Sequence, residues 1–217
     1  IVPSIQNPEK YYNSNVNGTL NLLQACRNAK VLKFLYSASS SCYGIPKKFP
    51  TTEDEKINTL YPYALTKKMG EDLIIHWSKL YNFPFISLRL FNVYGTRSRT
   101  SGTYGAMFGV FLAQKLHGKP FTIVGNGKQT RDFIHVDDLA NAFIKIIKSK
   151  CVNKIYNLGS GKRTSINTIA NMFNGKKKFI PIRPGEPKNS LANISKLKKD
   201  INWKPVVSLE EGIERLL

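Results

Sequence analysis

The part of the sequence that most constrains the fold is a helix-like stretch enclosed by two short apolar runs. The runs VLKFLYS (31–37) and FISLRLFN (85–92) predict buried strands. The stretch from Pro62 to Tyr81 predicts a helix, because proline suits the first helical turn. A further helix is expected from Pro8 to Ala29, where an Asn-Pro pair is a helix-start signal. Helix, strand, helix and strand in this order predict an α/β fold with a parallel sheet and right-handed crossovers.

Beyond Gly95 the pattern becomes mixed, starting with a loop rich in Gly, Ser and Thr at 95–105. Strands are predicted at FTIV (121–124), DFIHV (132–136) and KIYNLGS (154–160). Helices are predicted near 106–117, 137–149, 165–174, 193–199 and 208–217. We expect a smaller, mixed α/β domain in this half.

Composition narrows the class of partner. The 217-residue chain has a formal net charge of +19, which favours nucleic acid, an anionic membrane or a phosphate-bearing small molecule. Its 25 lysines are spread along the chain, and no basic helix carries interleaved aromatic residues, so a solvated lysine-rich surface is favoured over nucleic-acid binding. The longest apolar runs are far below the roughly 18 residues of a membrane helix, so no membrane partner is expected.

The three cysteines are scattered at Cys26, Cys42 and Cys151, without C-x-x-C spacing. This arrangement predicts neither a disulfide framework nor a metal site. A reducing, cytoplasmic location is expected.

A Tyr-x-x-x-Lys pair carries the candidate chemistry. With 10 tyrosines and 25 lysines, about one such match is expected by chance. Tyr43 and Lys47 match, but the glycine and proline between them exclude a helix. Tyr63 and Lys67 instead follow Pro62 at a predicted helix start, so they should project from one face a turn apart.

A cation beside a tyrosine stabilises the tyrosinate. Lowering a tyrosine pKa from about 10 toward 7 requires about 4 kcal/mol, which a desolvated lysine and a cofactor cation could provide. Such a tyrosine is a general base near neutral pH. The nearby run LYSASSSCYG (35–44) is a strand that ends in small hydroxyl residues, and ligands of parallel sheets bind at the carboxyl ends of strands. A serine there could hold a substrate hydroxyl against the tyrosine.

Several segments together resemble, in order and over essentially the whole chain, one family. It is the NAD-dependent epimerase/dehydratase family of extended short-chain dehydrogenase/reductases, above all its UDP-glucose and UDP-N-acetylglucosamine 4-epimerases. The matching segments include YPYALTKKMGED, LRLFNVYG, GNGKQTRDFIHVDDLANA, YNLGSGKRTSI and RPGEPKNSLANISKLKKDINWKP. The resemblance implies a Rossmann-like, doubly wound parallel sheet with a smaller mixed α/β substrate domain. Residues 1–95, with returning segments near 126–158, would belong to the NAD-binding domain, and 96–217 mostly to the nucleotide-sugar-binding domain.

The resemblance also implies site residues. The catalytic set would be Ser39, Tyr63 as the acid/base, and Lys67 as its partner on the nicotinamide ribose. The residues expected to contact NAD are Ser14, Ser37, Ser39, Tyr63, Lys67 and Phe91. The residues expected to bind the UDP-sugar are Ser39, Ser41, Tyr63, Asn92, Thr122, Ile123, Val124, Arg131, Arg183, Glu186 and Ser190. Arg131 would grip the diphosphate, and Arg183 with Glu186 would hold phosphate and ribose, unless these two form only a loop ion pair.

The implied reaction is 4-epimerisation through a 4-keto sugar, with no net redox change and NAD as the hydride carrier. Where the family's dehydratases carry acidic residues after the catalytic hydroxyl, this chain has Ser40 and Ser41, which favours epimerisation over dehydration. Ser190 stands where glucose-restricted relatives have tyrosine, which favours N-acetylated sugars, although UDP-glucose and UDP-galactose stay open. The alternatives are an epimerase or reductase for another nucleotide sugar such as UDP-glucuronate, and a catalytically silent nucleotide-sugar binder.

One departure from the family concerns the cofactor. The family opens with a strand, a glycine-rich G-x-x-G-x-x-G turn and a later acidic residue that receive the dinucleotide, and this sequence contains no such turn. The chain also begins without methionine. We therefore expect a fragment without its first strands, inactive unless another chain supplies them. The family's dimer contact, through the helices at 8–29 and 62–81, implies a homodimer.

Overall fold

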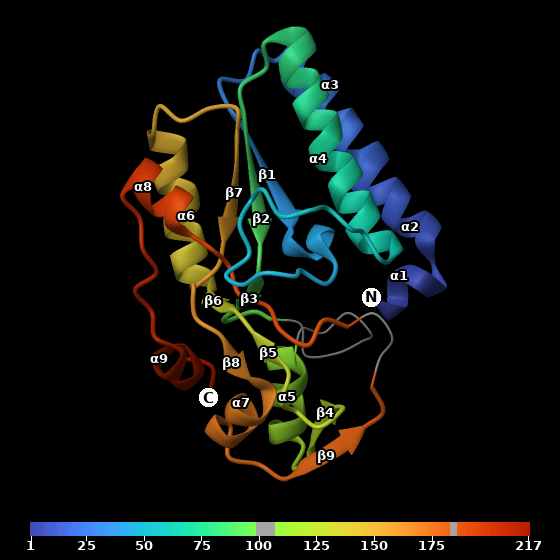
Figure 1. The fold of residues 1–217 in the computed structure, drawn as a ribbon, viewed down its shortest axis with the longest axis vertical. Helices are drawn as coiled ribbons and strands as arrows, with labels where there is room; N and C mark the ends of the chain where they lie inside the picture. Colours follow the sequence, from blue (N-terminus) through green and yellow to red (C-terminus); the bar gives the residue numbers. More distant parts are fainter. Residues whose placement is uncertain (99–106, 183–185) are drawn as a thin grey trace.

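The computed structural model describes residues 1–98, 107–182 and 186–217, and a parallel three-stranded sheet lies at its centre (Figure 1). The strand order is β1 (Phe34–Ser39), β2 (Phe85–Leu90) and β7 (Lys154–Leu158). Both pairings are parallel, with Phe34 opposite Phe85 and Ile86 opposite Lys154. The two apolar runs therefore lie side by side, as the sequence predicts.

Helices cover both faces of this sheet (Figure 1). On one face lie α3 (Gly18–Asn28) and α4 (Pro62–Tyr81), and on the other lie α6 (Val136–Lys148) and α8 (Ser195–Ile201). The side chains of β2 alternate accordingly. Phe85 joins a core with α3 and α4, while Ile86 and Leu88 join the core beneath α6 and α8.

The predicted helix at 8–29 is continuous but changes its winding. It comprises α2 (Pro8–Tyr12), a π-helical segment (Asn13–Asn17) and α3. The π segment aims the Asn15 side chain at the neighbouring helix, where its Nδ2 donates to Thr66 Oγ1 at 3.0 Å. Helix α4 begins at Pro62 and ends at Tyr81, as predicted.

The other half is built around an aromatic core. Phe111 and Phe121 stack with centroids 4.8 Å apart, and Phe173 meets both edge-on. The elements around this core are α5 (Met107–Leu116), β4 (Phe121–Val124), β6 (Phe133–His135), α7 (Ile166–Met172) and α9 (Leu209–Glu214). Sequence analysis missed the short α1 (Val2–Gln6) and three strands, β5 (Thr130–Arg131), β8 (Thr164–Ser165) and β9 (Lys177–Ile180).

The predicted strand at 85–92 is two strands, because its hydrogen-bond partner changes. Strand β2 ends at Leu90, the Phe91 N–H donates to Leu158 of β7, and the Asn92 N–H donates to Asp132. Asn92 thereby opens β3 (Asn92–Tyr94), which pairs with β6. This switch leaves Phe91 and Asn92 at the carboxyl end of the sheet.

Within the described ranges, no helix has the length and apolar character required to cross a membrane.

Candidate functional site

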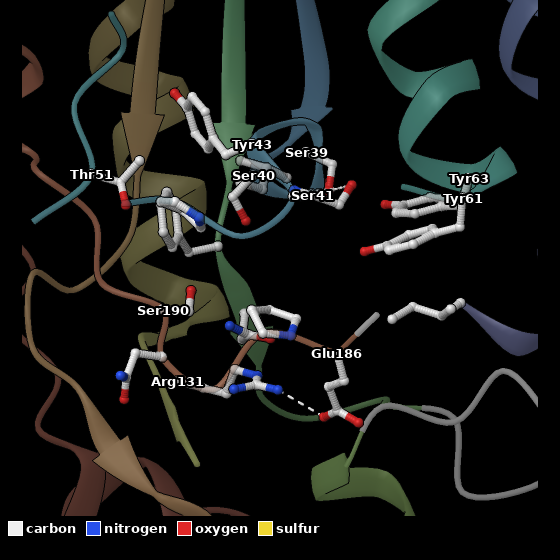
Figure 2. Close-up of a pocket in the computed structure, with 18 residues that line it drawn as sticks. Ser39, Ser40, Ser41, Tyr43, Thr51, Tyr61, Tyr63, Arg131, Glu186 and Ser190 are labelled. Atoms are coloured by element: carbon white, nitrogen blue, oxygen red, sulfur yellow. Dashed lines mark hydrogen bonds and ion pairs between the residues drawn. The ribbon is translucent and has the colours of Figure 1, made fainter. Parts of the chain in front are cut away.

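A cavity of about 360 Å³ opens at the carboxyl ends of β1 and β2 (Figure 2). It collects eight of the residues predicted from the sequence, which come from five separate parts of the chain. They are Ser39, Ser41, Tyr63, Phe91, Asn92, Arg131, Glu186 and Ser190. Sequence reasoning missed other lining residues, among them Tyr43, Thr51, Tyr61 and Asn189.

Ser39 is held as a hydrogen-bond donor. It caps a 3-10 turn (Ser40–Tyr43), and its Oγ accepts from the Ser41 N–H at 3.3 Å and from Ser41 Oγ at 2.8 Å. A serine hydroxyl has two acceptor positions and one proton. Ser39 is thereby fixed at the cavity wall, where its hydroxyl can donate its proton to a ligand.

Two tyrosines at the start of α4 point into the cavity (Figure 2). Tyr61 precedes Pro62 and is extended, as a residue before proline prefers, while Tyr63 lies in the first helical turn. Burial raises the pKa of Tyr61 to about 12, and a hydrogen bond with Ser41 and the charge of Arg131 oppose the shift. Tyr61 is therefore a neutral donor at neutral pH, and its place before Pro62 was the signal that could have revealed it.

Lys67 lies one turn beyond Tyr63 on α4 and is not among the residues that line the cavity. Its Nζ lies 4.6 Å from the centroid of the Tyr36 ring. Burial lowers the pKa of Lys67. The structure therefore places Lys67 on the same helix one turn from Tyr63, with its ammonium over the Tyr36 ring, and its pairing with Tyr63 stays a prediction.

An ion pair lies at the opposite end of the cavity. Arg131 Nη2 lies 2.7 Å from Glu186 Oε1, and Nη1 donates to the Thr130 carbonyl at 2.9 Å (Figure 2). Burial lowers the pKa of Arg131, and the charge of Glu186 opposes this shift. Glu186 Oε2 is buried without a hydrogen-bond partner among the described residues, a state that costs about 1–3 kcal/mol until a donor such as a ligand hydroxyl arrives. Arg183, the predicted companion of Glu186, lies outside the described residues.

A second cavity of about 360 Å³ lies beyond Arg131. It shares Asn92, Arg131 and Glu186 with the first cavity, and its other walls are mainly apolar. They are formed by Met107, Val110, Phe111, Thr122, Val124, Gln129, Phe133 and Ile166. The two cavities thus form a cleft with a hydroxyl-lined end, an arginine in the middle and an apolar end.

Besides Lys67, three predicted site residues of the described part of the chain lie outside both cavities. Thr122 and Val124 face the second cavity, but the alternation of β4 turns Ile123 into the core, where it is fully buried. Ser14 and Ser37 are exposed and line neither cavity, so their contact with a cofactor stays a prediction. No group of three His, Cys, Asp or Glu side chains suited to a metal occurs in the described part of the chain.

A buried polar network joins the elements that carry the site. Glu71 of α4 binds Arg89 through Oε1 at 2.7 Å and accepts from Ser87 Oγ through Oε2 at 2.7 Å. Arg89 Nη1 donates to the Tyr43 hydroxyl at 3.0 Å, which donates to Asn157 Oδ1 at 2.7 Å. Through this network α4 and the turn after Ser39 keep one position on β2 and β7.

The segment that carries Glu186 and Ser190 is tied down in a similar way. Asp132 Oδ2 accepts from the Ala192 N–H at 3.0 Å, and the Thr51 N–H donates to the Leu191 carbonyl at 2.8 Å. Ser190 is therefore a fixed wall of the hydroxyl-lined end.

Comparison with known proteins shows which family has a sequence like this one. Residues 2–159 match the model of the family described as "NAD dependent epimerase/dehydratase family". A protein of Methanocaldococcus jannaschii described as a putative UDP-glucose 4-epimerase is 35% identical over 99% of this chain and 71% of its own length.

Two solved structures are similar throughout the described fold. A UDP-N-acetylglucosamine 4-epimerase from Methanobrevibacter ruminantium, in complex with UDP-N-acetylmuramic acid, has a TM-score of 0.94 and 32% identity over 100% of this chain and 71% of its own. A UDP-glucuronic acid 4-epimerase from Bacillus cereus, in complex with UDP-glucuronic acid and NAD, has a TM-score of 0.87 and 35% identity over 94% of this chain and 66% of its own. The chain thus spans about two thirds of the length of these relatives.

Proposed function

The chain belongs to the NAD-dependent epimerase/dehydratase family, and on that premise we propose that it is a UDP-sugar 4-epimerase. The Rossmann-like α/β fold and the NAD dependence of the family, both predicted from the sequence, are confirmed. The activity of this chain, its sugar and the roles of its residues are our proposal. We assign 1–95 and 126–158 mainly to cofactor binding and the rest mainly to the nucleotide sugar.

The observation that supports the proposal is the order in which apolar, cationic and hydroxyl side chains line the cleft. A UDP-sugar has a flat base, a diphosphate and a hydroxyl-rich ring, and the cleft offers apolar walls, Arg131 and a set of hydroxyl groups in the same order. An arginine fork suits a diphosphate, and the unpaired Oε2 of Glu186 suits a ribose hydroxyl. Thr122 and Val124 would then border the base.

The residues at the hydroxyl-lined end supply the proton chemistry. Tyr63 would accept the proton of the sugar 4-hydroxyl as general base, with Lys67 one turn further along the same helix. Ser39 would donate its one free proton to the same sugar oxygen, holding it against Tyr63. Phe91 and Lys67 fit the nicotinamide end of NAD, which when bound supplies a reversible hydride acceptor.

We propose a neutral UDP-sugar, with UDP-N-acetylglucosamine and UDP-N-acetylgalactosamine ahead of UDP-glucose and UDP-galactose. The small Ser190 leaves room at the hydroxyl-lined end for an acetamido group. Among the described residues that line this end no side chain is cationic, since Arg131 lies at the other end and pairs with Glu186. A buried carboxylate without a cation is costly, which disfavours a uronic acid.

We further propose a homodimer that assembles through α3 and α4. Leu22 on α3 and Leu65 and Leu80 on α4 are exposed, so these helices present apolar surface to a partner.

We also propose a cytoplasmic location. The three cysteines are free, as a reducing cytoplasm would allow.

Calorimetric titration of the chain with UDP-N-acetylglucosamine, UDP-glucuronate and UDP tests the site. We expect the acetamido sugar to bind more tightly than the uronate, and Arg131→Met to weaken all three ligands by at least tenfold, as loss of a charged hydrogen bond implies. Arg215→Met, on the exposed surface, is the control. If Arg131→Met binds each of the three ligands as tightly as the unaltered chain does, the assignment of Arg131 to the diphosphate is refuted.

A further inference from the structure

Lys67 is a half-buried cation without a neighbouring carboxylate. Burial lowers its pKa, and no neighbouring charge opposes that shift. No carboxylate of the described residues lies within ion-pairing distance of its ammonium group. Long cationic side chains in such places are usually paired. Another group must therefore hold this side chain in place.

That group is Tyr36 of β1. The face of its ring lies beneath Lys67 Nζ, 4.6 Å from centroid to nitrogen, which is within the range of a cation–π contact. Its hydroxyl donates to the backbone carbonyl of Lys67 at 3.2 Å. One side chain thus holds both the backbone and the ammonium of the same lysine.

A neighbouring glycine makes this contact possible. Gly70 faces the Tyr36 hydroxyl, and any larger residue there would place its Cβ on the hydroxyl and the ring. A buried hydroxyl is costly unless it is bonded, so a phenylalanine would serve packing alone at lower cost. The hydroxyl bond and the glycine fix where the ring lies, and the ring is the part of Tyr36 that faces the ammonium.

We propose that Tyr36 is the positioning residue for Lys67, holding the ammonium by its ring so that the charge and its N–H donors stay available to a ligand. A carboxylate in the same place would neutralise the charge and occupy donors. An aromatic face attracts the cation without accepting its hydrogen bonds in this way. The proposal depends on the proposed function in one respect, because that function supplies the cofactor hydroxyl that Lys67 would bind.

A double-mutant cycle on folding stability tests the contact without any ligand. Tyr36→Leu removes the ring, and Lys67→Met removes the charge but keeps an apolar stem. We expect the two changes to couple by about fivefold in the unfolding equilibrium constant, as a cation–π contact implies. Tyr36→Phe should keep most of the coupling with Lys67→Met, because it keeps the ring.

Phe83→Leu is the matched control, because Phe83 is buried in the same core. Its coupling with Lys67→Met should be absent. Equal coupling of Lys67→Met with Phe83→Leu and with Tyr36→Leu, or none with either, would overturn the proposal. If Tyr36→Leu does not fold, Tyr36→Phe and Tyr36→Met against Lys67→Met provide the same comparison.

NAD binding separates this proposal from the proposed function. Tyr36→Leu should weaken NAD about as much as Lys67→Met does, while Tyr36→Phe and Phe83→Leu leave the affinity within about twofold. Full NAD affinity in Tyr36→Leu would overturn the positioning role. A chain that shows the coupling but does not bind NAD would instead contradict the proposed function and support the contact.

Discussion

Glu71 and Arg89 form a two-point ion pair inside the protein. Glu71 Oε1 lies 2.7 Å from Arg89 Nη2, and Oε2 lies 3.2 Å from Nε, with both side chains almost fully buried. The pair fastens the helix of Tyr63 to the strand that leads to Phe91. It therefore links the stability of the fold to the geometry of the site.

Breaking this pair from one side should be costly. Arg89→Met leaves a buried carboxylate, which we expect to lower the free energy of unfolding by about 3–5 kcal/mol. The double change Glu71→Met/Arg89→Met leaves no buried charge and should recover much of that loss. Urea unfolding measures both. Arg215→Met removes an exposed pair and should cost less than about 1 kcal/mol. A double variant as unstable as Arg89→Met would contradict this account.

Gly70→Ala should destabilise the protein although alanine favours helices. Its methyl group would overlap the Tyr36 hydroxyl and come within 3.2 Å of the Asn15 carbonyl. Overpacking of this kind costs about 1–3 kcal/mol, more than the helix propensity returns. Gly18→Ala is the control, because it meets only the Asn13 carbonyl, at 3.7 Å, and should stabilise by about 0.5–1 kcal/mol. Thermal unfolding measures the stability of both variants. A stabilised Gly70→Ala would count against the close contact with Tyr36.

Tyr61→Phe should weaken UDP-sugar binding. The Tyr61 hydroxyl points into the cavity as a neutral donor near Ser41 and Arg131. Losing one such hydrogen bond should raise the dissociation constant by about three- to tenfold. Tyr81→Phe, at the far end of α4, should have no effect. Calorimetry with UDP-N-acetylglucosamine makes the comparison, and unchanged binding by Tyr61→Phe would exclude Tyr61 from the site.

Stability should fall at alkaline pH. Burial raises the pKa of both Tyr36 and Tyr61 to about 12, whereas an unfolded tyrosine ionises near about 10. The folded state then keeps protons that the unfolded state loses, so this stabilisation is complete below about pH 10 and is lost as the pH rises through about 12. Urea unfolding between pH 8 and about 11.5 measures the slope. Tyr61→Phe should flatten it, and an identical slope in that variant would contradict the shift.

Local signals predicted the main elements well. Pro62 marks the first residue of α4, and the four-residue spacing of Tyr63 and Lys67 places both on that helix. The apolar runs identified β1 and β2, although β2 also buries Ser87 and Arg89 and β1 leaves Ser37 exposed. Of the three residues predicted to be catalytic, Ser39 and Tyr63 line the cavity and Lys67 does not.

Contacts between segments distant in the chain could not be predicted from the sequence. The sequence contains 13 Asp or Glu residues besides Glu186 that could pair with Arg131. Only the fold shows that Glu186 is its partner. Strand β9 was missed because its run, KKFI, is half charged and gains its partner β4 from far earlier in the chain. The division of 85–92 into two strands depends on which neighbour each N–H meets, and no local pattern encodes that choice.

The measurement that tests the central claim most directly is proton NMR of the anomeric signals of UDP-N-acetylglucosamine incubated with NAD and the chain joined to the first strands and glycine-rich turn of a family member. The account predicts that signals of UDP-N-acetylgalactosamine grow to equilibrium, and that Tyr63→Phe abolishes this conversion while calorimetry shows nearly unchanged binding of the sugar. Binding of UDP-sugars by the joined protein, with its Tyr63 intact, without conversion of any of them would contradict the account and identify a silent nucleotide-sugar binder.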